Sequence, residues 1–320
     1  MVQTKFKMVE KTETGGLSKI LSKSVSRNMN THVLATGMSG LVGTRIRELL
    51  CDEFEFTDLS YTTGIDITNY DDVLSHIEST QAKTIIHMAA KTEVDACEDE
   101  KILGEDGKCW LVNVVGTENV VSAAKKTGKK IIYISTDFVF DGTKDTYDED
   151  DSPNPVNWYG YTKFEGEKII QDSSVDYLII RIAYPYRAYF QEKKDFVRRI
   201  LENIKSKKRI SGLTDHIFTP TFIDDIANAL RFFINSNNQG IYHVVGSQSL
   251  TVYDAVRKIA DLFSYKPDIE AVTRQAYFKN RAFRPFKLSL KNDKISKLGL
   301  TMKTFDEGLR TVKDQLETAY

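Results

Sequence analysis

The chain has 320 residues, a formal net charge of -1, and 41% hydrophobic and 28% charged residues. This composition is ordinary for a globular protein with one large or two smaller domains, and it argues against nucleic-acid or membrane-surface binding driven by net charge. Three cysteines without CxxC spacing predict reduced thiols in a cytoplasmic protein, with no metal site. No apolar run approaches the roughly 18 residues that would span a bilayer.

Residues 1–29 differ from the rest of the chain, because lysines there alternate with serine and threonine and apolar runs are short. We predict a polar N-terminal extension that lies outside the fold. An organelle transit peptide is the alternative, and Glu10 and Glu13 argue against it.

A glycine-rich turn follows the first predicted strand, Thr31 to Thr36, and leads into a predicted helix, Leu41 to Leu50. Gly37, Gly40 and Gly43 have the spacing GxxGxxG. A glycine turn between a strand and a helix lets the backbone approach a pyrophosphate at the positive end of the helix. The stretch therefore predicts a dinucleotide site, although a glycine turn without function would look the same.

The second predicted strand, residues 53–57, ends at Asp58, where an acidic side chain can bind a ribose 2′-hydroxyl. Residues 51–66 contain no lysine or arginine, which favours NAD(H) over NADP(H). Arg45 is the residue that argues against this preference. We predict a brief strand at residues 64–68, with Asp66 placed to meet the adenine amino group.

A buried strand at residues 83–88 is predicted to end in small residues, Ala89 and Ala90, followed by Lys91. Small side chains after a central strand leave room for a cofactor. We expect a surface loop at residues 98–108 and a helix at residues 109–127. Asn113 in that helix either supports the active site or makes an ordinary helix contact.

Chemically versatile side chains follow the next apolar strand, residues 130–134. Thr136 lies at the strand end, and Tyr159 and Lys163 are four apart on a predicted helix that Asn157 would cap. A phenol, an ammonium and a hydroxyl can together move a proton to or from a carbonyl oxygen. A Tyr-x-x-x-Lys pair alone is more commonly an ordinary helix surface pair, so the interpretation depends on the glycine turn.

Strands alternating with helices predict an α/β fold with a Rossmann-type doubly wound parallel sheet and a smaller C-terminal substrate-binding α+β part. We assign residues 30–185 and 220–246 to the dinucleotide-binding domain, and residues 186–219 and 247–320 to the substrate-binding part. The other expected elements are a helix at 69–80, a loop at 143–157, strands at 175–182 and 241–245, helices at 195–205, 223–234, 252–263 and 305–320, and irregular chain at 266–290.

Six motifs in order resemble the extended short-chain dehydrogenases/reductases, and within them the dTDP-4-dehydrorhamnose reductase group. The resemblance runs from about Thr31 to the C-terminus. The matching motifs are Gly37-x-x-Gly40-x-x-Gly43, the stretch from His87 to Asp95, Asn113-Val114-Val115-Gly116-Thr117, the stretch from Ser135 to Gly142, Tyr159-Gly160-Tyr161-Thr162-Lys163 with Gly166-Glu167, and Pro220-Thr221 with Asp224-Asp225.

The resemblance implies site residues beyond those given by the chemistry of the side chains. It implies catalytic roles for Thr136, Tyr159 and Lys163, cofactor contacts for Ser39, Leu41, Val42 and Ile67, and substrate contacts for Val94, Asp137, Phe138 and Arg284. The chain departs from the group in a longer segment at 98–108, in Phe138 where tyrosine is usual, and in Leu288 where the Arg-Pro-x-x-Ser-x-Leu pattern has serine.

The resemblance implies NAD(P)H-dependent reduction of the 4-keto group of a nucleotide-activated deoxysugar, with Tyr159 giving the proton. Phe138 cannot transfer a proton, which argues against a 4,6-dehydratase. A nucleotide-sugar 4-epimerase and a regulatory subunit resembling that of methionine adenosyltransferase remain the alternatives. The nucleotide sugar is the expected partner, and a homodimer is left open.

Overall fold

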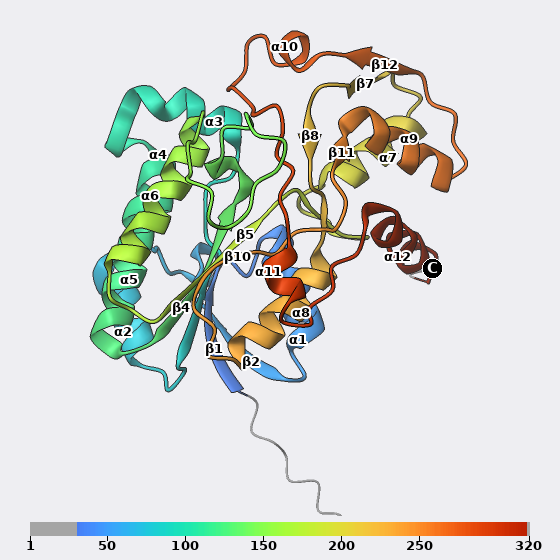
Figure 1. Cartoon of the computed structure of the whole chain (residues 1–320). Coiled ribbons are helices and arrows are strands. Elements are labelled where there is room, and N and C mark those ends of the chain that lie inside the picture. Colours follow the sequence, from blue (N-terminus) through green and yellow to red (C-terminus); the bar gives the residue numbers. More distant parts are fainter. Residues whose placement is uncertain (1–30, 319–320) are drawn as a thin grey trace, which may run out of the picture.

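A six-stranded parallel sheet forms the centre of the computed structural model, which describes residues 31–318 (Figure 1). The strand order is β10-β5-β4-β3-β1-β2, so the order reverses beside β1. This confirms the predicted Rossmann-type doubly wound fold. The strands of the sheet are β1 Thr31–Thr36, β2 Phe54–Asp58, β3 Thr84–His87, β4 Lys130–Thr136, β5 Tyr177–Ile182 and β10 Gly240–His243.

Helices cover both faces of the sheet, as Figure 1 shows, and the central strands are buried on both sides. Near-continuous apolar runs such as the one in β4 are typical of parallel strands covered on both faces. One face carries α2 Tyr70–Glu78, α5 Gly116–Thr127 and α6 Trp158–Asp172, and the other carries α1 Leu41–Leu50 and α8 Ile223–Ile234.

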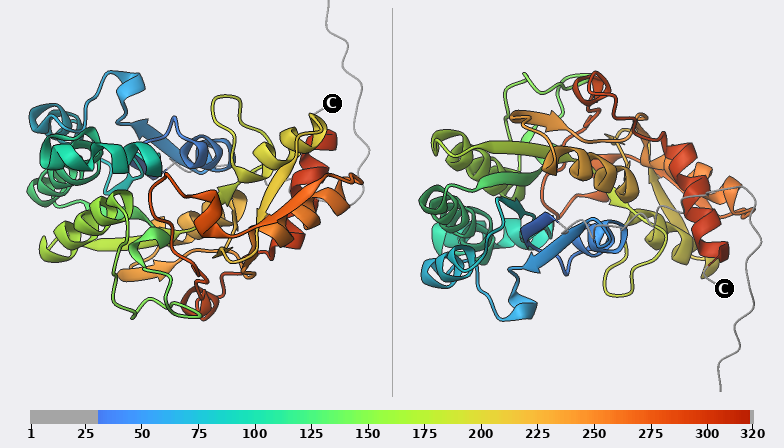
Figure 2. Two further views of the ribbon diagram at one scale, coloured as in Figure 1. Left: turned by 90° about the horizontal axis from the view of Figure 1, so that it is seen from above. Right: turned by 90° about the horizontal axis from the view of Figure 1, so that it is seen from below.

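A second group of elements lies beside the carboxyl end of the sheet (Figures 1 and 2). It has its own apolar core, which includes Val197, Phe218, Ile259 and Phe305. Three strand pairs belong to it rather than to a second large sheet. Its elements are β6 Pro185–Tyr186, α7 Phe196–Lys205, β7 Ile210–Leu213, β8 Ile217–Phe218, β9 Thr221–Phe222, β11 Leu250–Thr251, α9 Val252–Leu262, β12 Ile269–Val272, α10 Arg274–Tyr277 and α12 Phe305–Thr318. The short α11 Asp293–Ser296 returns to the sheet, where Ile295 joins the sheet core.

Two local predictions are wrong. Residues 64–68 form a turn rather than a strand, because Asp66 bonds within the turn to the Thr68 backbone N–H at 2.9 Å and hydroxyl at 2.8 Å. Residues 98–108 are largely helical rather than a loop, with α3 Val94–Asp99, η2 Glu100–Asp106 and α4 Lys108–Trp110. Gly104 interrupts this helical stretch with a φ of 55°.

Other boundaries agree with expectation within a few residues. The helix expected at 109–127 is continuous in direction but contains a π-helical turn, η3 Leu111–Val115. The region expected to be irregular at 266–290 contains the short β12 and α10. The predicted extension, residues 1–29, lies outside the described residues.

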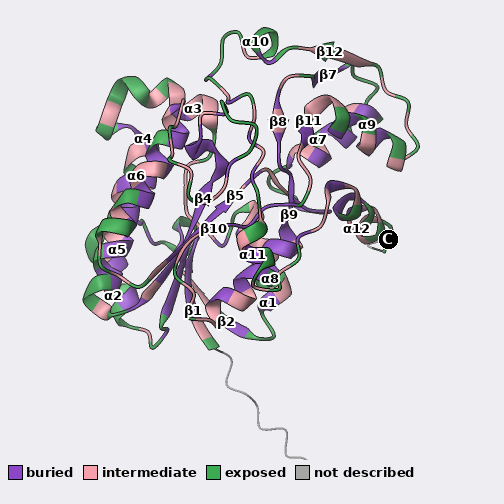
Figure 3. Cartoon of the chain, viewed as in Figure 1, coloured by how far each residue is buried: buried purple, intermediate pink, exposed green. Residues whose placement is uncertain are grey.

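The strands of the central sheet are the most buried segments of the chain, and the helices around them are partly exposed (Figure 3). In the part of the chain from 31 to 318, no helix is both long and apolar enough to cross a bilayer. The same residues contain no cluster of three or more His, Cys, Asp or Glu side chains arranged to hold a metal ion.

Candidate active site

The candidate site begins where β4 ends, at the carboxyl edge of the sheet. Thr136 is the last residue of β4 and is 6% exposed. Its hydroxyl donates to Oδ1 of Asp137 at 3.0 Å and accepts a hydrogen bond from the backbone N–H of Phe138 at 3.2 Å. These contacts fix the hydroxyl at the strand end, where the doubly wound fold places ligands.

Helix α6 brings the tyrosine and the lysine to the same edge. Its N-cap is Asn157, whose side chain accepts a hydrogen bond from the Gly160 backbone N–H at 2.8 Å, as predicted. A Cβ at Gly160 would lie 2.2 Å from the carbonyl oxygen of Phe138, so glycine allows α6 to pack against the chain after β4. The ring of Tyr159 consequently lies 5.8 Å from that of Phe138, between centroids.

Burial shifts the pKa values of both Tyr159 and Lys163. Burial raises the pKa of Tyr159 above its ordinary value, although the Thr136 hydroxyl opposes the shift. Lys163 is 2% exposed, and burial lowers its pKa to about 7 despite the nearby Glu167 carboxylate. Its Nζ lies 4.0 Å from the centroid of the Tyr133 ring. The chain alone therefore keeps the phenol protonated at neutral pH.

A buried ion pair lies beneath these residues, one helical turn beyond Lys163. The Glu167 carboxylate accepts hydrogen bonds from Nε and Nη2 of Arg181 at 2.9 and 2.7 Å, and from the Ser135 hydroxyl at 2.5 Å. Arg181 lies near the end of β5, and its buried side chain takes part in this pair. Glu167 belongs to a matching motif, yet sequence reasoning gave it no role.

Asp137 has an unusual environment. It is 1% exposed, and its Oδ2 has no hydrogen-bond partner among the described residues. Burial raises its pKa to about 7, against opposing hydrogen bonds that include the one from Thr136. An unpartnered buried oxygen at a strand end is available to a ligand.

The glycine turn fits a dinucleotide. Gly37 has a φ of 73°, and a Cβ there would lie 2.7 Å from the Ala89 nitrogen. A Cβ at Gly43 would lie 2.6 Å from the Cα of Met38, so glycine permits the helix to pack closely. Gly40, by contrast, meets only one atom, at 3.3 Å, and no side chain caps α1. The N–H groups of Leu41 and Val42 at the start of the helix, and of Ser39 in the turn before it, are therefore placed to bind phosphate.

The cation that contacts Asp58, the expected ribose-binding residue, is Arg47 and not Arg45. Asp58 ends β2 and accepts a hydrogen bond from Nη2 of Arg47 at 3.1 Å. Arg45 instead makes a bidentate pair with Asp224, with both distances 2.7 Å. Both arginines lie on α1, and only the packing of α1 against β2 shows that Arg47 is the one that reaches Asp58.

The predicted adenine contacts lie in the turn after η1 Tyr61–Thr63. Asp66 is exposed there, whereas Ile67 is 7% exposed, and its Cδ1 would be 2.7 Å from a Cβ at Gly116. Ile67 thus packs against the start of α5.

Asn113 supports the chain after β3. Its side chain accepts a hydrogen bond from the Lys91 N–H at 2.8 Å and donates to the Lys91 carbonyl at 3.1 Å and to the Thr162 hydroxyl at 2.9 Å. These contacts fit the role of Asn113 as a support of the candidate site better than an ordinary contact within the helix. Ala89 is fixed by its N–H, which donates to Thr36 at 3.0 Å. Ala90 lies between these two anchored residues.

The predicted substrate residues Val94 and Arg284 lie near one another, although nearly two hundred positions separate them. Val94 begins α3, and the neighbouring Asp95 accepts a hydrogen bond from Arg284 and one from the Ala282 N–H at 3.1 Å. The Arg284 guanidinium lies 4.8 Å from the ring centroid of Phe278. The C-terminal segment is therefore tied to the sheet domain across the site.

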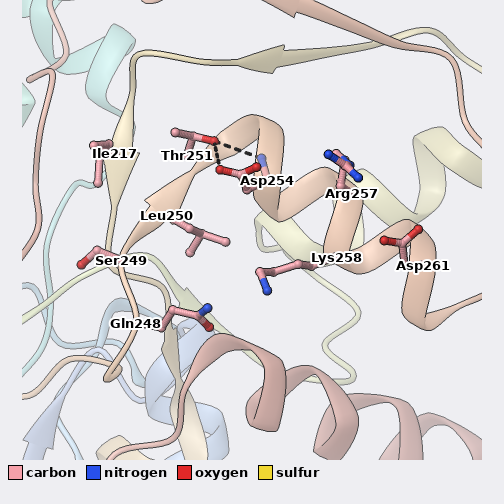
Figure 4. Close-up of a pocket in the computed structure, with 9 residues that line it drawn as sticks. All are labelled: Ile217, Gln248, Ser249, Leu250, Thr251, Asp254, Arg257, Lys258 and Asp261. Atoms are coloured by element: carbon pink, nitrogen blue, oxygen red, sulfur yellow. Dashed lines mark hydrogen bonds between the residues drawn. The ribbon is translucent and has the colours of Figure 1, made fainter.

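A hollow of about 500 Å³ lies elsewhere, along α9 and β11 (Figure 4). Lys258 and Gln248 line it, and Thr251 bonds to Asp254 at its edge. None of its lining residues is a predicted site residue, and its side chains do not form a proton-transfer set.

The sheet, the glycine turn and the Thr136, Tyr159 and Lys163 set define the class as the extended short-chain dehydrogenases/reductases, which are NAD(P)-dependent oxidoreductases. Residues 31–318 match the family model described as RmlD substrate binding domain. The chain therefore belongs to the RmlD family.

Relatives of the chain include both named reductases and a named subunit of another enzyme. A dTDP-4-dehydrorhamnose reductase from Aggregatibacter actinomycetemcomitans is 30% identical over 300 residues, covering 89% of this chain and 99% of its own length. Methionine adenosyltransferase 2 subunit beta from Xenopus tropicalis is 27% identical over 293 residues, covering 87% of this chain and 85% of its own length.

Solved structures agree with the fold. A dTDP-4-dehydrorhamnose reductase from Bacillus anthracis, in complex with NADP, has a TM-score of 0.82 at 29% identity and covers 90% of this chain and 100% of its own. A Thermus thermophilus UDP-glucose 4-epimerase in complex with NAD, at 20% identity, has a TM-score of 0.76 and supports the fold alone.

Proposed function

We propose that the chain reduces the 4-keto group of a nucleotide-activated deoxysugar with NADH or NADPH. The observation that carries the proposal is the meeting of Thr136 at the end of β4 with Tyr159 and Lys163 on α6, at the edge that also carries the glycine turn. The named reductases among the relatives support the substrate class.

The residues that would hold the cofactor are those of the turn and of the neighbouring strand ends. Gly37 to Val42 would surround the pyrophosphate, Asp58 the adenosine ribose, and Asp66 and Ile67 the adenine. Ala89 to Lys91 would border the nicotinamide half, with Lys163 beside its ribose. When bound, a dihydronicotinamide supplies the hydride for carbonyl reduction.

Tyr159 would donate its phenolic proton to the oxygen that develops negative charge. Its raised pKa keeps the donor protonated at neutral pH, and Lys163 would stabilise the phenolate that donation leaves. Thr136, whose O–H donates to Asp137 in the structure, would turn that O–H to the substrate oxygen and stabilise the developing oxyanion. Asp137, Phe138, Val94 and Arg284 would surround the sugar nucleotide.

The cofactor preference we propose is NADH over NADPH. Asp58 can accept from the ribose hydroxyls and already neutralises Arg47, so a 2′-phosphate would meet a carboxylate first. The NADP-bound relative shows that this family can bind the phosphorylated form.

A second candidate is a subunit that acts through a partner protein, favoured by the likeness to methionine adenosyltransferase 2 subunit beta. The buried Thr136, Tyr159 and Lys163 set fits catalysis better, because two of its groups are desolvated where a carbonyl would bind. Phe138 cannot serve as the proton-transfer residue that a dehydratase needs.

Tyr159→Phe separates catalysis from binding. We expect turnover of a dTDP-4-keto-deoxysugar to fall by about 10²-fold or more, the contribution of one general acid, with cofactor affinity nearly unchanged. Tyr161→Phe is the matched control, because Tyr161 lies on the same helix and is 38% exposed. Equal turnover of the two variants would show that the proton comes from elsewhere.

A further inference from the structure

Tyr184 has a backbone conformation that bulky residues rarely adopt. It lies two positions after β5 ends and has a φ of 41°. A positive φ is a steric outlier for an aromatic residue, and such strain persists only where the surroundings enforce it. Strained residues of this kind cluster at functional sites, and this one lies at the edge of the sheet that carries the candidate site.

Aromatic packing and one hydrogen bond hold Tyr184 in place. Its ring centroid lies 4.6 Å from that of Phe218 and 6.3 Å from that of Phe138. Its hydroxyl lies 2.9 Å from Nε2 of His216, which is 2% exposed. Nδ1 of the same histidine lies 2.9 Å from the carbonyl oxygen of Pro285.

The contact of His216 with the Pro285 carbonyl determines which group donates in the Tyr184–His216 hydrogen bond. A carbonyl oxygen can only accept, so Nδ1 of His216 carries the hydrogen and donates to Pro285. Burial lowers the pKa of His216 to about 4, so the ring is neutral near pH 7 and its Nε2 is a bare acceptor. The Tyr184 O–H therefore donates to His216, and its oxygen is left with lone pairs only.

The Tyr184 oxygen lies among the proposed substrate residues. Thr136 pairs with Ile182 in the sheet, which places the end of β4 beside the start of this segment. Phe138 contacts the rings of both Tyr159 and Tyr184. Burial raises the pKa of the Tyr184 phenol, the Asp137 carboxyl adds to the rise, and the Arg284 guanidinium opposes it.

We propose that Tyr184, fixed by His216, is a specificity residue that accepts a hydrogen bond from a ring hydroxyl of the keto-sugar. This inference rests on the proposed function and adds to it a requirement on the substrate. His216 is a positioning residue, because it acts only by accepting the hydrogen bond from the Tyr184 hydroxyl. A sugar without the hydroxyl would leave the Tyr184 oxygen unpaired.

The test compares four variants on a dTDP-4-keto-deoxysugar and on a panel of analogues, each lacking one ring hydroxyl. Tyr184→Phe and His216→Leu should lower kcat/KM for the parent sugar about 10-fold, the scale of one hydrogen bond, without changing KM for the cofactor. His216→Gln should keep more activity than His216→Leu, because its amide oxygen can accept from Tyr184. Tyr186→Phe is the control, since its buried hydroxyl packs against Gly308 on α12.

The analogues identify the contact. For one deoxy analogue, Tyr184→Phe and the unaltered chain should give the same kcat/KM, because the bond is already absent. If Tyr184→Phe matches Tyr186→Phe on the parent sugar, the inference is wrong while the proposed function stands.

If the unaltered chain turns over no keto-sugar, the proposed function fails. Calorimetric binding of the same sugars then decides the role of Tyr184. A weaker affinity of Tyr184→Phe for the parent sugar alone would support the contact, and equal affinities would overturn it.

Discussion

Breaking the buried Glu167–Arg181 ion pair should lower the stability of the fold by a large amount, because both side chains are almost completely buried. Glu167→Gln removes the negative charge that faces Arg181, whose side chain is 1% exposed. The guanidinium then keeps its charge without an ionised partner. Its neighbours include the His243 ring, 3.5 Å away with a pKa lowered by burial, and the Phe140 ring, whose centroid is 5.0 Å from Cζ. Breaking one side of a buried pair costs about 3–5 kcal/mol. That loss corresponds to a melting temperature lower by roughly 5–8 °C for a protein of this size.

Thermal unfolding followed by circular dichroism measures this loss. Glu202→Gln is the control, because its pair with Lys194 is half exposed at 50% and 53%. The control should change stability by less than about 0.5 kcal/mol. If both variants unfold at the same temperature, the reasoning that Arg181 is a desolvated charge held by Glu167 is refuted.

Three further predictions test the surroundings of the site. Because the pKa of Asp137 is raised from 3.8 to about 7, its native-state stabilisation is complete below about pH 4 and is lost as pH rises through about 7. Asp137→Asn should therefore match the unaltered chain near pH 4 and exceed it at about pH 8 by up to roughly 4 kcal/mol in urea unfolding; equal pH profiles would contradict the burial of this carboxyl. Asp58→Ala should free Arg47 and raise the NADPH-to-NADH ratio of kcat/KM by about 10-fold, which an unchanged ratio would disprove. Gly37→Ala should cost about 2 kcal/mol more than Gly64→Ala in the same unfolding assay, because both have positive φ but only the first meets backbone atoms within 4 Å.

The sheet, and the places of the candidate site residues on its strands and helices, could be predicted because local pattern and chemistry agree there. The run that becomes β4 is apolar and ends in polar residues, and the strand register then fixes where Thr136 lies. Tyr159 and Lys163 were predictable from helical spacing, and Asn157 from its capping preference.

The two wrong local predictions failed because short-range hydrogen bonds override the residue pattern on which each prediction relied. Residues 64–68 alternate like a strand, yet Asp66 bonds within the turn. The helical stretch at 98–108 contains two glycines that predict a loop, but Glu100 there accepts a hydrogen bond from the Cys109 N–H at 2.7 Å.

Roles that depend on tertiary contacts could not be predicted from the sequence. Arg47 meets Asp58 only once α1 packs beside β2, so the sequence drew attention to Arg45 instead. The Tyr184 and His216 pair joins residues thirty-two positions apart, and no motif connects them.

The measurement that bears most directly on the central claim is the oxidation of NADH or NADPH by the purified chain with a panel of nucleotide-linked 4-keto-deoxysugars. The account predicts one cofactor oxidised for each keto-sugar reduced to the 4-hydroxy product, with the loss of absorbance abolished by omitting the sugar. Absence of cofactor oxidation with every sugar of the panel, by protein that binds the cofactor, would contradict it.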